Sequence, residues 1–327
     1  MSDTAYVVFT VFSQMAVGAL IAMVIADFVG KEKKFFETAS WVIVPVAIIS
    51  IVAILSHEAR PLLAMMTMSA NLGSSWLSRE SLMLTIFTVL AVIYTCLWVF
   101  EPEYGSFKRI SGTIHGLIAK IAKPFVPFRK PIGVIFALVG IAFLYTSAKA
   151  YMLMGLPAMN HITTLLFFIV TALLTGTMLV TAFLSIKYRM APEEYAEPLS
   201  SYLGVVWKVV LGSVIAGIII LAGYLQILKG PAVSHGAELA QGMTLANILS
   251  GEMTTIFWLY LIIGFILSVI LVAAVAALRK KDVSKAAVLS ILLFASVLIG
   301  EILGRIVFFG ANVPLGEVMP YVIPPII

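Results

Sequence analysis

The sequence predicts an all-α integral membrane protein, an eight-transmembrane-helix bundle with both termini on the non-cytoplasmic side. Of its 327 residues, 61% are hydrophobic and 11% are charged, whereas soluble domains contain about 25% charged residues. The mean hydropathy is +1.09. Lysine and arginine are concentrated in alternate loops, and this asymmetry sets the orientation of a membrane protein. We expect a single membrane domain over residues 1–327.

Eight apolar stretches are long enough to cross a bilayer, which takes about 17–25 residues. No lysine or arginine precedes the first stretch. The basic start of a cleaved signal peptide is therefore missing, and we expect this span to be retained. The predicted spans cover residues 5–29, 40–57, 80–100, 132–154, 160–186, 202–228, 254–278 and 286–309.

The distribution of basic residues predicts which side of the membrane each loop occupies. The loops after the first, third, fifth and seventh spans contain most of the lysines and arginines. Cytoplasmic loops are enriched in these residues, so we place these four loops in the cytoplasm and the protein in the cell (inner) membrane. The opposite side holds few basic residues, namely Arg60, Arg79, Lys149, Lys229 and Arg305.

Two loops are too long to be simple turns. Residues 101–131 carry apolar side chains at helical spacing, flanked by lysines and Arg109. This pattern predicts a helix in the cytoplasmic interface that is attracted to anionic membrane lipid. We interpret residues 229–253 as a solvated or partner-facing loop. The apolar positions of the first loop are Phe107, Ile110, Ile114, Leu117, Ile118 and Ile121.

Polar residues inside the spans gather toward the non-cytoplasmic side. A charge in the hydrocarbon core costs roughly 2.5–3.5 kcal/mol, so these residues mark a site or a specific contact. Glu301 and Arg305 are four residues apart, which places both on one helix face, and we expect them to pair. The cytoplasmic halves of the spans hold little besides charges that flank the interface. The gathered residues are Gln14, His57, Glu80, Lys149, His161, Glu301 and Arg305.

His57 and Glu80 bracket one non-cytoplasmic loop. A helix C-terminus favours the charged imidazole of His57, and a helix N-terminus capped by Ser78 favours the carboxylate of Glu80. Two groups with separately tuned proton affinities fit chemistry that releases two protons, such as the oxidation of a quinol. We therefore interpret His57 as the first proton acceptor and Glu80 as the group that passes the proton outward.

The protein offers few ligands for a redox centre of its own. Its four histidines form no pair inside the spans, and Cys96 is its one cysteine. We therefore expect no haem, no iron–sulfur cluster and no other metal site. No basic face suits nucleic acid. Electrons from a quinol would have to pass to a partner protein.

Several segments form a pattern that extends over most of the chain. Residues 9–14 read FTVFSQ, the second span ends in His57, and residues 71–80 read NLGSSWLSRE. Span four ends in Lys149-Ala150-Tyr151, and residues 300–310 read GEILGRIVFFG. In their order, their spacing and their side of the membrane, these segments resemble the membrane-anchor subunits of dimethyl sulfoxide reductase-type molybdoenzymes.

The resemblance implies a haem-free anchor that oxidises quinol, such as menaquinol, near the non-cytoplasmic face. It implies two partners, a four-cluster iron–sulfur subunit and a molybdopterin catalytic subunit, and it assigns His57 and Glu80 to the quinol site. Lys149 stands where the family usually has arginine, and Glu58-Ala59-Arg60 stands where it more often has small residues. The residues expected to contact quinol are Gln14, Arg60, Lys149, Glu301 and Arg305.

Two other functions are compatible with the sequence. One is a secondary transporter with an outward-facing polar site, although such sites usually lie near the bilayer midplane. The other is an inert subunit that only tethers its partners. The terminal substrate, the direction of electron flow and the quinone type are not encoded in these patterns.

Overall fold

The computed structural model describes residues 4–30, 32–57, 66 and 70–322, and within these ranges the protein forms helices and no strands. Eight helical segments are long and apolar enough to cross a membrane, which confirms the predicted number of spans. They are Thr4–Val29, Lys33–Ser56, Trp76–Val99, Val126–Tyr151, Ile162–Met190, Pro192–Ile227, Thr254–Leu278 and Val283–Met319.

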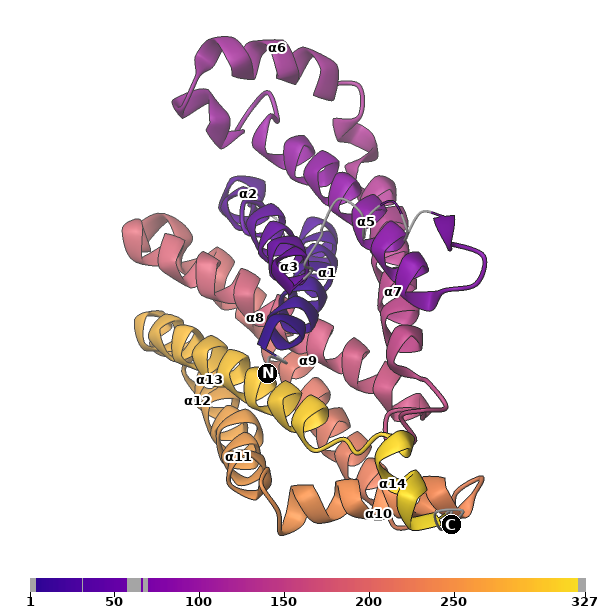
Figure 1. Ribbon diagram of the computed structural model, residues 1–327. Helices are drawn as coiled ribbons and strands as arrows, with labels where there is room; N and C mark the ends of the chain where they lie inside the picture. Colours follow the sequence, from indigo (N-terminus) through magenta and orange to yellow (C-terminus); the bar gives the residue numbers. More distant parts are fainter. Residues whose placement is uncertain (1–3, 31, 58–65, 67–69, 323–327) are drawn as a thin grey trace.

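Several spans are built from more than one helix (Figure 1). A turn at residues 41–42 divides the second span, and a π-helical segment, η3, interrupts the seventh. The elements are α1 (Thr4–Val29), α2 (Lys33–Ser40), α3 (Ile43–His57), α5 (Trp76–Val99), η1 (Ser106–Arg109), α6 (Gly112–Ala122), η2 (Val126–Phe128), α7 (Arg129–Tyr151), α8 (Ile162–Met190), α9 (Pro192–Ile227), α10 (His235–Leu249), α11 (Thr254–Leu259), η3 (Tyr260–Leu267), α12 (Ser268–Leu278), α13 (Val283–Gly310) and α14 (Leu315–Val322).

The helix α1 lies at the centre of the bundle, where it packs against α8, α3, α7 and α13. Its closest approach is to α8. A Cβ on Gly18 would lie 1.6 Å from the carbonyl oxygen of Ala172, and a Cβ on Gly176 would lie 2.1 Å from the backbone of Gly18. Because glycine leaves this space open, the two backbones touch. This contact brings the neighbouring polar residues of α1 and α8 close together.

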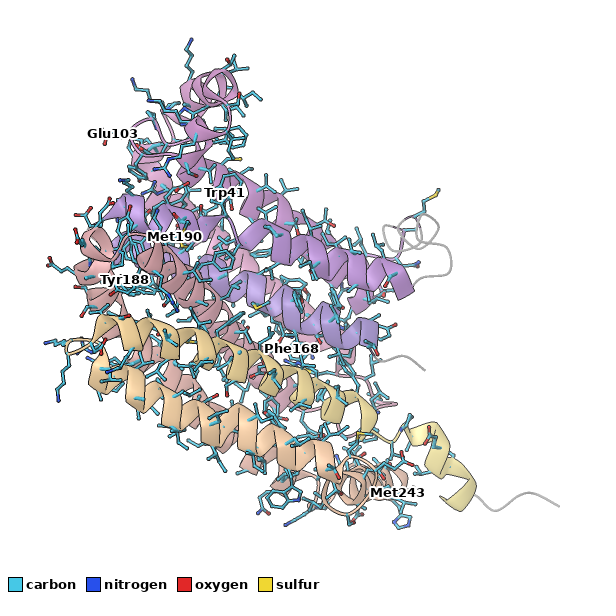
Figure 2. The ribbon with its side chains drawn as sticks, turned by 90° about the vertical axis from the view of Figure 1, so that its left-hand side faces the viewer. Trp41, Glu103, Phe168, Tyr188, Met190 and Met243 are labelled. Atoms are coloured by element: carbon cyan, nitrogen blue, oxygen red, sulfur yellow. The ribbon has the colours of Figure 1, made fainter. Side chains whose placement is uncertain are left out.

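The two ends of the bundle differ in charge. We call one end the basic end; it consists of the connections from α1 to α2, from α5 to α7, from α8 to α9 and from α12 to α13, with the helix ends beside them. The opposite end carries the start of α1, the last turns of α7 and α13, and the helices α10 and α14. Figure 2 shows Tyr188 and Met190 near the basic end and Met243 at the opposite end.

The loop at 229–253 contains a helix that the sequence analysis missed. In α10, small residues such as Ala240 pack against Val313, just before α14, and Val318 within it. Ser234 caps its start, because its hydroxyl accepts a hydrogen bond from the backbone N–H of Ala237 at 3.2 Å. A helix of small residues has little apolar periodicity, and periodicity is the main sequence signal for a helix. The segment was therefore predicted to be a loop, although Ser234 is a suitable N-cap.

Charges near the basic end were expected to do little besides flank the interface, but two of them are buried and paired. Asp27, near the end of α1, is 1% exposed and forms a bidentate pair with Arg129 of α7. Both N–H···O distances are 2.9 Å. The guanidinium also donates to Tyr104 at 2.9 Å and stacks on Trp98 with its Cζ 3.7 Å from the ring centroid. This network fastens α7 and the 101–128 segment to α1.

Candidate functional site

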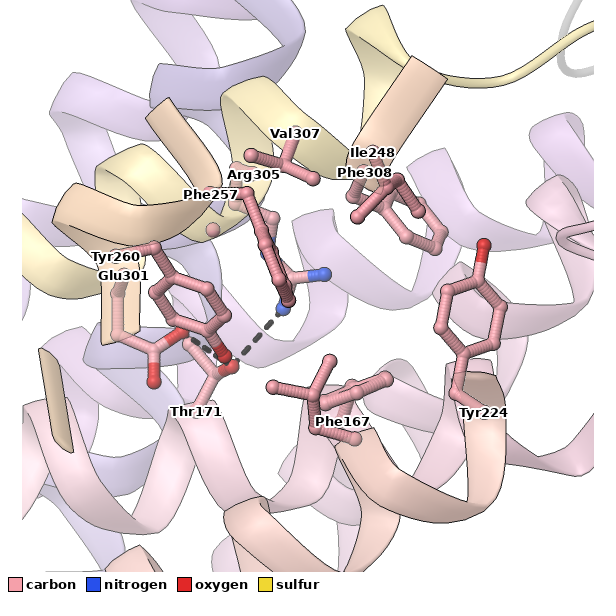
Figure 3. Close-up of a pocket in the computed structure, with 12 residues that line it drawn as sticks. Phe167, Thr171, Tyr224, Ile248, Phe257, Tyr260, Glu301, Arg305, Val307 and Phe308 are labelled. Atoms are coloured by element: carbon pink, nitrogen blue, oxygen red, sulfur yellow. Dashed lines mark hydrogen bonds between the residues drawn. The ribbon is translucent and has the colours of Figure 1, made fainter. Parts of the chain in front are cut away.

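Three helices bring a buried polar cluster together near the opposite end. Gln14 of α1, Thr171 of α8 and Arg305 of α13 are all at most 3% exposed. The Arg305 Nη2 donates to Gln14 Oε1 at 2.6 Å and to Thr171 Oγ1 at 3.0 Å. The Thr171 hydroxyl in turn donates to Glu301 Oε2 at 2.9 Å. Figure 3 shows the two bonds that meet at Thr171.

The expected direct pairing of Glu301 with Arg305 is therefore corrected. Both side chains lie on the same side of α13, but the Thr171 hydroxyl stands between them and bonds to each. No ion pair joins the two within the part of the protein that the structure describes. Helical spacing predicts which side chains share a face, but partners on other helices decide which bonds form.

Arg305 is held by aromatic rings as well as by hydrogen bonds. Its Cζ lies 4.3 Å from the ring centroid of Phe168 and 5.7 Å from that of Phe308. Cations over aromatic faces gain up to about 2 kcal/mol when they are desolvated. These rings fix the plane of the guanidinium and partly compensate for its burial.

Glu80 forms a second buried polar group on α5. It is 1% exposed, and its Oε1 accepts a hydrogen bond from Ser147 of α7 at 2.5 Å. The helix begins at Trp76 with Ser75 as its cap, not at Glu80 with Ser78, so Glu80 lies in the second turn. This start buries the carboxylate between α5 and α7 and does not leave it at a helix entrance.

Tyr151, the last residue of α7, lies beside the Arg305 group and one helical turn after Ser147, the partner of Glu80. Its ring packs against Phe168 and Phe309, with centroid separations of 5.8 and 5.4 Å. Phe168 is also the ring that covers the guanidinium of Arg305. We call the Glu80 group, Tyr151 and the Arg305 group together the Tyr151 site.

Three buried atoms of this site have no hydrogen-bond partner among the described residues. They are the Nε2 of Gln14, the Oε2 of Glu80 and the Nε of Arg305. Buried polar groups in proteins are nearly always satisfied, and an isolated one costs about 1–3 kcal/mol. Two donors and one acceptor of the site are thus left without a partner in the protein.

A cavity of about 50 Å³ adjoins Thr171, Glu301 and Arg305. A water molecule needs about 10–15 Å³ and a benzene-sized ligand about 150 Å³, so this cavity holds a few waters and no quinone ring. Figure 3 shows its aromatic walls and its polar side. It is lined by Phe167, Thr171, Leu221, Tyr224, Ile248, Phe257, Tyr260, Glu301, Gly304, Arg305, Val307 and Phe308.

The π-helical segment positions one wall of this cavity. Tyr260 lies at its start, and a Cβ on Gly300 would be 2.4 Å from the Cα of Gly264. The close approach of the two backbones places Glu301 beside Tyr260, as Figure 3 shows. π-helical turns occur frequently at functional sites because they reorient the side chains around them.

The remaining residues predicted from the sequence lie elsewhere or are not described. Lys149 points toward Trp76, with Nζ 5.8 Å from the ring centroid. It is two residues from both Ser147 and Tyr151, which puts it on a different face of α7. Arg60 and the side chain of His57 lie outside the described residues; His57 is the last residue of α3. The roles proposed for these three residues stay predictions.

His161 precedes α8 and contacts α10. The Nε2 atoms of His161 and Gln241 are 2.9 Å apart, and Gln241 also donates to the carbonyl of Pro157 at 3.3 Å. Burial lowers the pKa of His161 below its ordinary value of 6.5. The imidazole is thus neutral at pH 7 and ties α10 to the segment between α7 and α8.

Sequence reasoning missed Ser147, Tyr151 and Thr171 as members of the site. Ser147 and Tyr151 are four residues apart and therefore share one face of α7. Thr171 belongs to a row of buried hydroxyl residues along α8 that includes Thr164 and Thr175. The spacing on α7 and the row of hydroxyl residues on α8 are both visible in the sequence. Neither shows which residues of other helices these side chains contact.

The fold and the site define a class of protein. It is a multi-pass helical membrane protein that encloses a small, partly unsatisfied polar site near one end. The family model described as DMSO reductase anchor subunit (DmsC) matches residues 1–110 and 104–311. The protein belongs to this family.

A curated relative supports this assignment over almost the whole length. It is the C subunit of the anaerobic dimethyl sulfoxide reductase of Haemophilus influenzae. The two proteins are 25% identical over 313 residues, and the match covers 95% of each. The protein is accordingly a multi-pass inner-membrane anchor subunit. Its family implies a complex with a catalytic subunit and an electron-transfer subunit.

Proposed function

We propose that this anchor oxidises a quinol, menaquinol in the first instance, at the Tyr151 site. The observation that carries the proposal is the set of three buried atoms without partners, Gln14 Nε2, Glu80 Oε2 and Arg305 Nε. A quinol hydroxyl donates one hydrogen bond and accepts others, so it matches one free acceptor and two free donors. The aromatic rings around Tyr151 suit a flat ring system.

The residues divide the chemistry between proton removal and charge stabilisation. Oxidation of one quinol gives a quinone, two protons and two electrons. The carboxylate of Glu80 accepts a proton through its free Oε2, and His57, at the end of α3, accepts the other. Gln14 and Arg305 donate to the quinol oxygens and stabilise the negative charge that develops as each proton leaves.

The electrons leave this subunit for its partners. The family's electron-transfer subunit receives them, in our proposal through four iron–sulfur clusters, and a molybdopterin catalytic subunit consumes them. Contributions of Lys149 and Arg60 to quinol binding stay predictions from the sequence. Menaquinol enters sideways from the lipid.

We assign the Tyr151 site to the non-cytoplasmic side. The connections of the basic end, together with the helix ends beside them, carry most of the lysines and arginines, and such segments stay in the cytoplasm. The start of α1 and the last helix α14 belong to the opposite end, so both termini lie outside the cytoplasm. Protons from the quinol are released on that side.

The decisive experiment separates quinol oxidation from simple tethering. The purified complex carrying Glu80→Gln is assayed with a quinol and, in parallel, with a soluble dye that reduces the partner subunits directly. Positioned proton acceptors contribute about 10²–10⁴-fold. We expect quinol-dependent turnover to fall by at least about 100-fold while dye-dependent turnover and subunit composition stay unchanged.

A matched control uses an exposed glutamate of the same end. Glu238 lies in the first turn of α10 and is exposed, so Glu238→Gln removes the same charge without touching the site. If Glu80→Gln keeps the quinol turnover of Glu238→Gln, the protein is a tether and the quinol is oxidised elsewhere.

A further inference from the structure

The helix α6 projects from the basic end, apart from the other helices (Figure 1). It belongs to the segment that joins α5 to α7, and Figure 2 shows Glu103 of this segment near Trp41, at the same end as Tyr188 and Met190. The helix is 11 residues long, too short to span a bilayer. It therefore does not cross the membrane and lies at its surface.

Specific contacts fix the start of this segment. The Trp41 Nε1 donates to Ser106 Oγ at 2.8 Å, and the backbone N–H of Ser106 donates to Glu37 Oε1 at 3.3 Å. Phe107 stacks on Trp41 at 6.2 Å and lies against Phe100 at 4.6 Å. The buried Asp27–Arg129 pair fixes its other end. The orientation of α6 is thus set by contacts at both ends and is not that of a loose loop.

One face of α6 packs against the bundle, and another is uncovered. His115, Ala119 and Ala122 are buried, and Ala122 and Ile118 lie against the ends of α5 and α7. The uncovered face presents large apolar side chains, two of them about two-thirds exposed. Its members are Ile114 (48%), Leu117 (66%) and Ile121 (65%), and Ile110 (67%) precedes them just before α6.

This apolar face continues into the lipid-facing surface of the bundle. Phe125 and Phe128 follow α6 and are more than half exposed, and Ile135 and Leu138 of α7 are exposed to a similar degree. In a membrane protein, the exposed apolar side of a spanning helix faces the acyl chains. Exposed apolar side chains thus follow the sequence from this acyl-facing part of α7 back to α6.

The charges around this face have one sign. Five exposed basic residues surround it, and the sequence contains no aspartate or glutamate between Glu103 and Glu193. Lysine and arginine side chains attract an anionic membrane surface by about 1 kcal/mol each when they lie near it, and no acidic residue of this stretch of the sequence opposes them. The five residues are Lys108, Arg109, Lys120, Lys123 and Lys130.

We propose that α6 is a binding surface for anionic phospholipids of the leaflet at the basic end. Ile114, Leu117 and Ile121 enter the boundary between headgroups and acyl chains, while the lysines contact the lipid phosphates. An acidic protein partner would match the lysines but would not continue the apolar strip onto α7. This inference is independent of the quinol chemistry at the opposite end.

The test measures which lipid touches α6 in the full-length protein. In a Cys96→Ala background, Leu117→Cys carries a fluorophore, and the protein is placed in nanodiscs of phosphatidylcholine and phosphatidylglycerol. Either lipid is supplied with brominated acyl chains, which quench a fluorophore on contact. We expect quenching by both lipids, with brominated phosphatidylglycerol quenching more strongly at equal mole fraction.

Charge variants test the headgroup contact. Combining Lys108→Gln, Lys120→Gln and Lys123→Gln should strongly reduce the preference for phosphatidylglycerol, because each lysine contributes roughly fivefold to local enrichment; Arg109 and Lys130 remain. The matched control replaces three lysines elsewhere at the same end by glutamine and should keep the preference: Lys280 and Lys281, just before α13, and Lys285 in its first turn. Both variants must elute as the unmodified protein does from a sizing column.

Three results would overturn the proposal. Absence of quenching by either lipid would show that α6 does not lie against acyl chains. Equal quenching by both lipids in the unmodified protein would show apolar insertion without selection of anionic headgroups, and so would a preference that is unchanged by the loss of Lys108, Lys120 and Lys123.

Discussion

Replacing Thr171 by valine tests whether the polar cluster holds the bundle together. The change keeps the shape of the side chain but removes two hydrogen bonds, the donation to Glu301 at 2.9 Å and the acceptance from Arg305 at 3.0 Å. Hydrogen bonds between membrane helices contribute about 0.6 kcal/mol on average and at most about 1.7. Two such bonds to charged partners give an expected loss of about 1–3 kcal/mol.

The assay is the free energy of unfolding in detergent, followed by helical circular dichroism as a denaturing detergent is added. Thr171→Ser keeps the hydroxyl and should retain most of the stability. The matched control is Thr175→Val, one turn along the same helix, whose hydroxyl bonds only to the Thr171 carbonyl of its own helix at 2.6 Å. Equal stability of Thr171→Val and Thr175→Val would refute the bridging role of Thr171.

Other predictions concern the fold around the site. Asp27→Asn breaks the buried pair and should cost about 3–5 kcal/mol of unfolding free energy, whereas Lys34→Gln breaks an exposed pair and should cost less than about 1; similar losses in both would contradict the burial argument. Because burial lowers the pKa of His161, the unfolded protein binds its proton more readily. The unfolding free energy should therefore fall as the pH drops through 6.5, and His161→Gln should remove that part of the slope; an unchanged slope would exclude this cause. Gly18→Ala places a Cβ 1.6 Å from a carbonyl oxygen of α8 and should abolish folded yield on a sizing column, whereas Gly223→Ala, where a Cβ meets nothing within 4 Å, should leave it intact.

The eight spans could be predicted from the sequence because each needs only a long apolar run. The boundaries were less certain. Ser74, Ser75 and Ser78 are all suitable caps, and the structure uses Ser75, which moves Glu80 from the helix entrance into the buried second turn. A single sequence offers no physical basis for choosing among neighbouring serines.

Partners on distant helices were beyond the reach of sequence patterns. Asp27 looked like a charge flanking the interface, but its partner Arg129 is 102 positions away. In the same way, the spacing of Glu301 and Arg305 predicted a shared face, and Thr171 between them was not foreseen. Local patterns indicate which residues are costly to bury, and only the helix packing decides what satisfies them.

The most direct test of the central claim locates the quinol in the intact complex. A photoreactive naphthoquinol analogue is cross-linked under light, and labelled peptides are identified by mass spectrometry, with excess unlabelled menaquinol as competitor. We predict competed labelling on the peptides that carry Glu80, Tyr151 and Arg305, and its loss when Arg305 is replaced by leucine. Labelling confined to the partner subunits, or to helices away from these residues, would contradict a quinol site within this anchor.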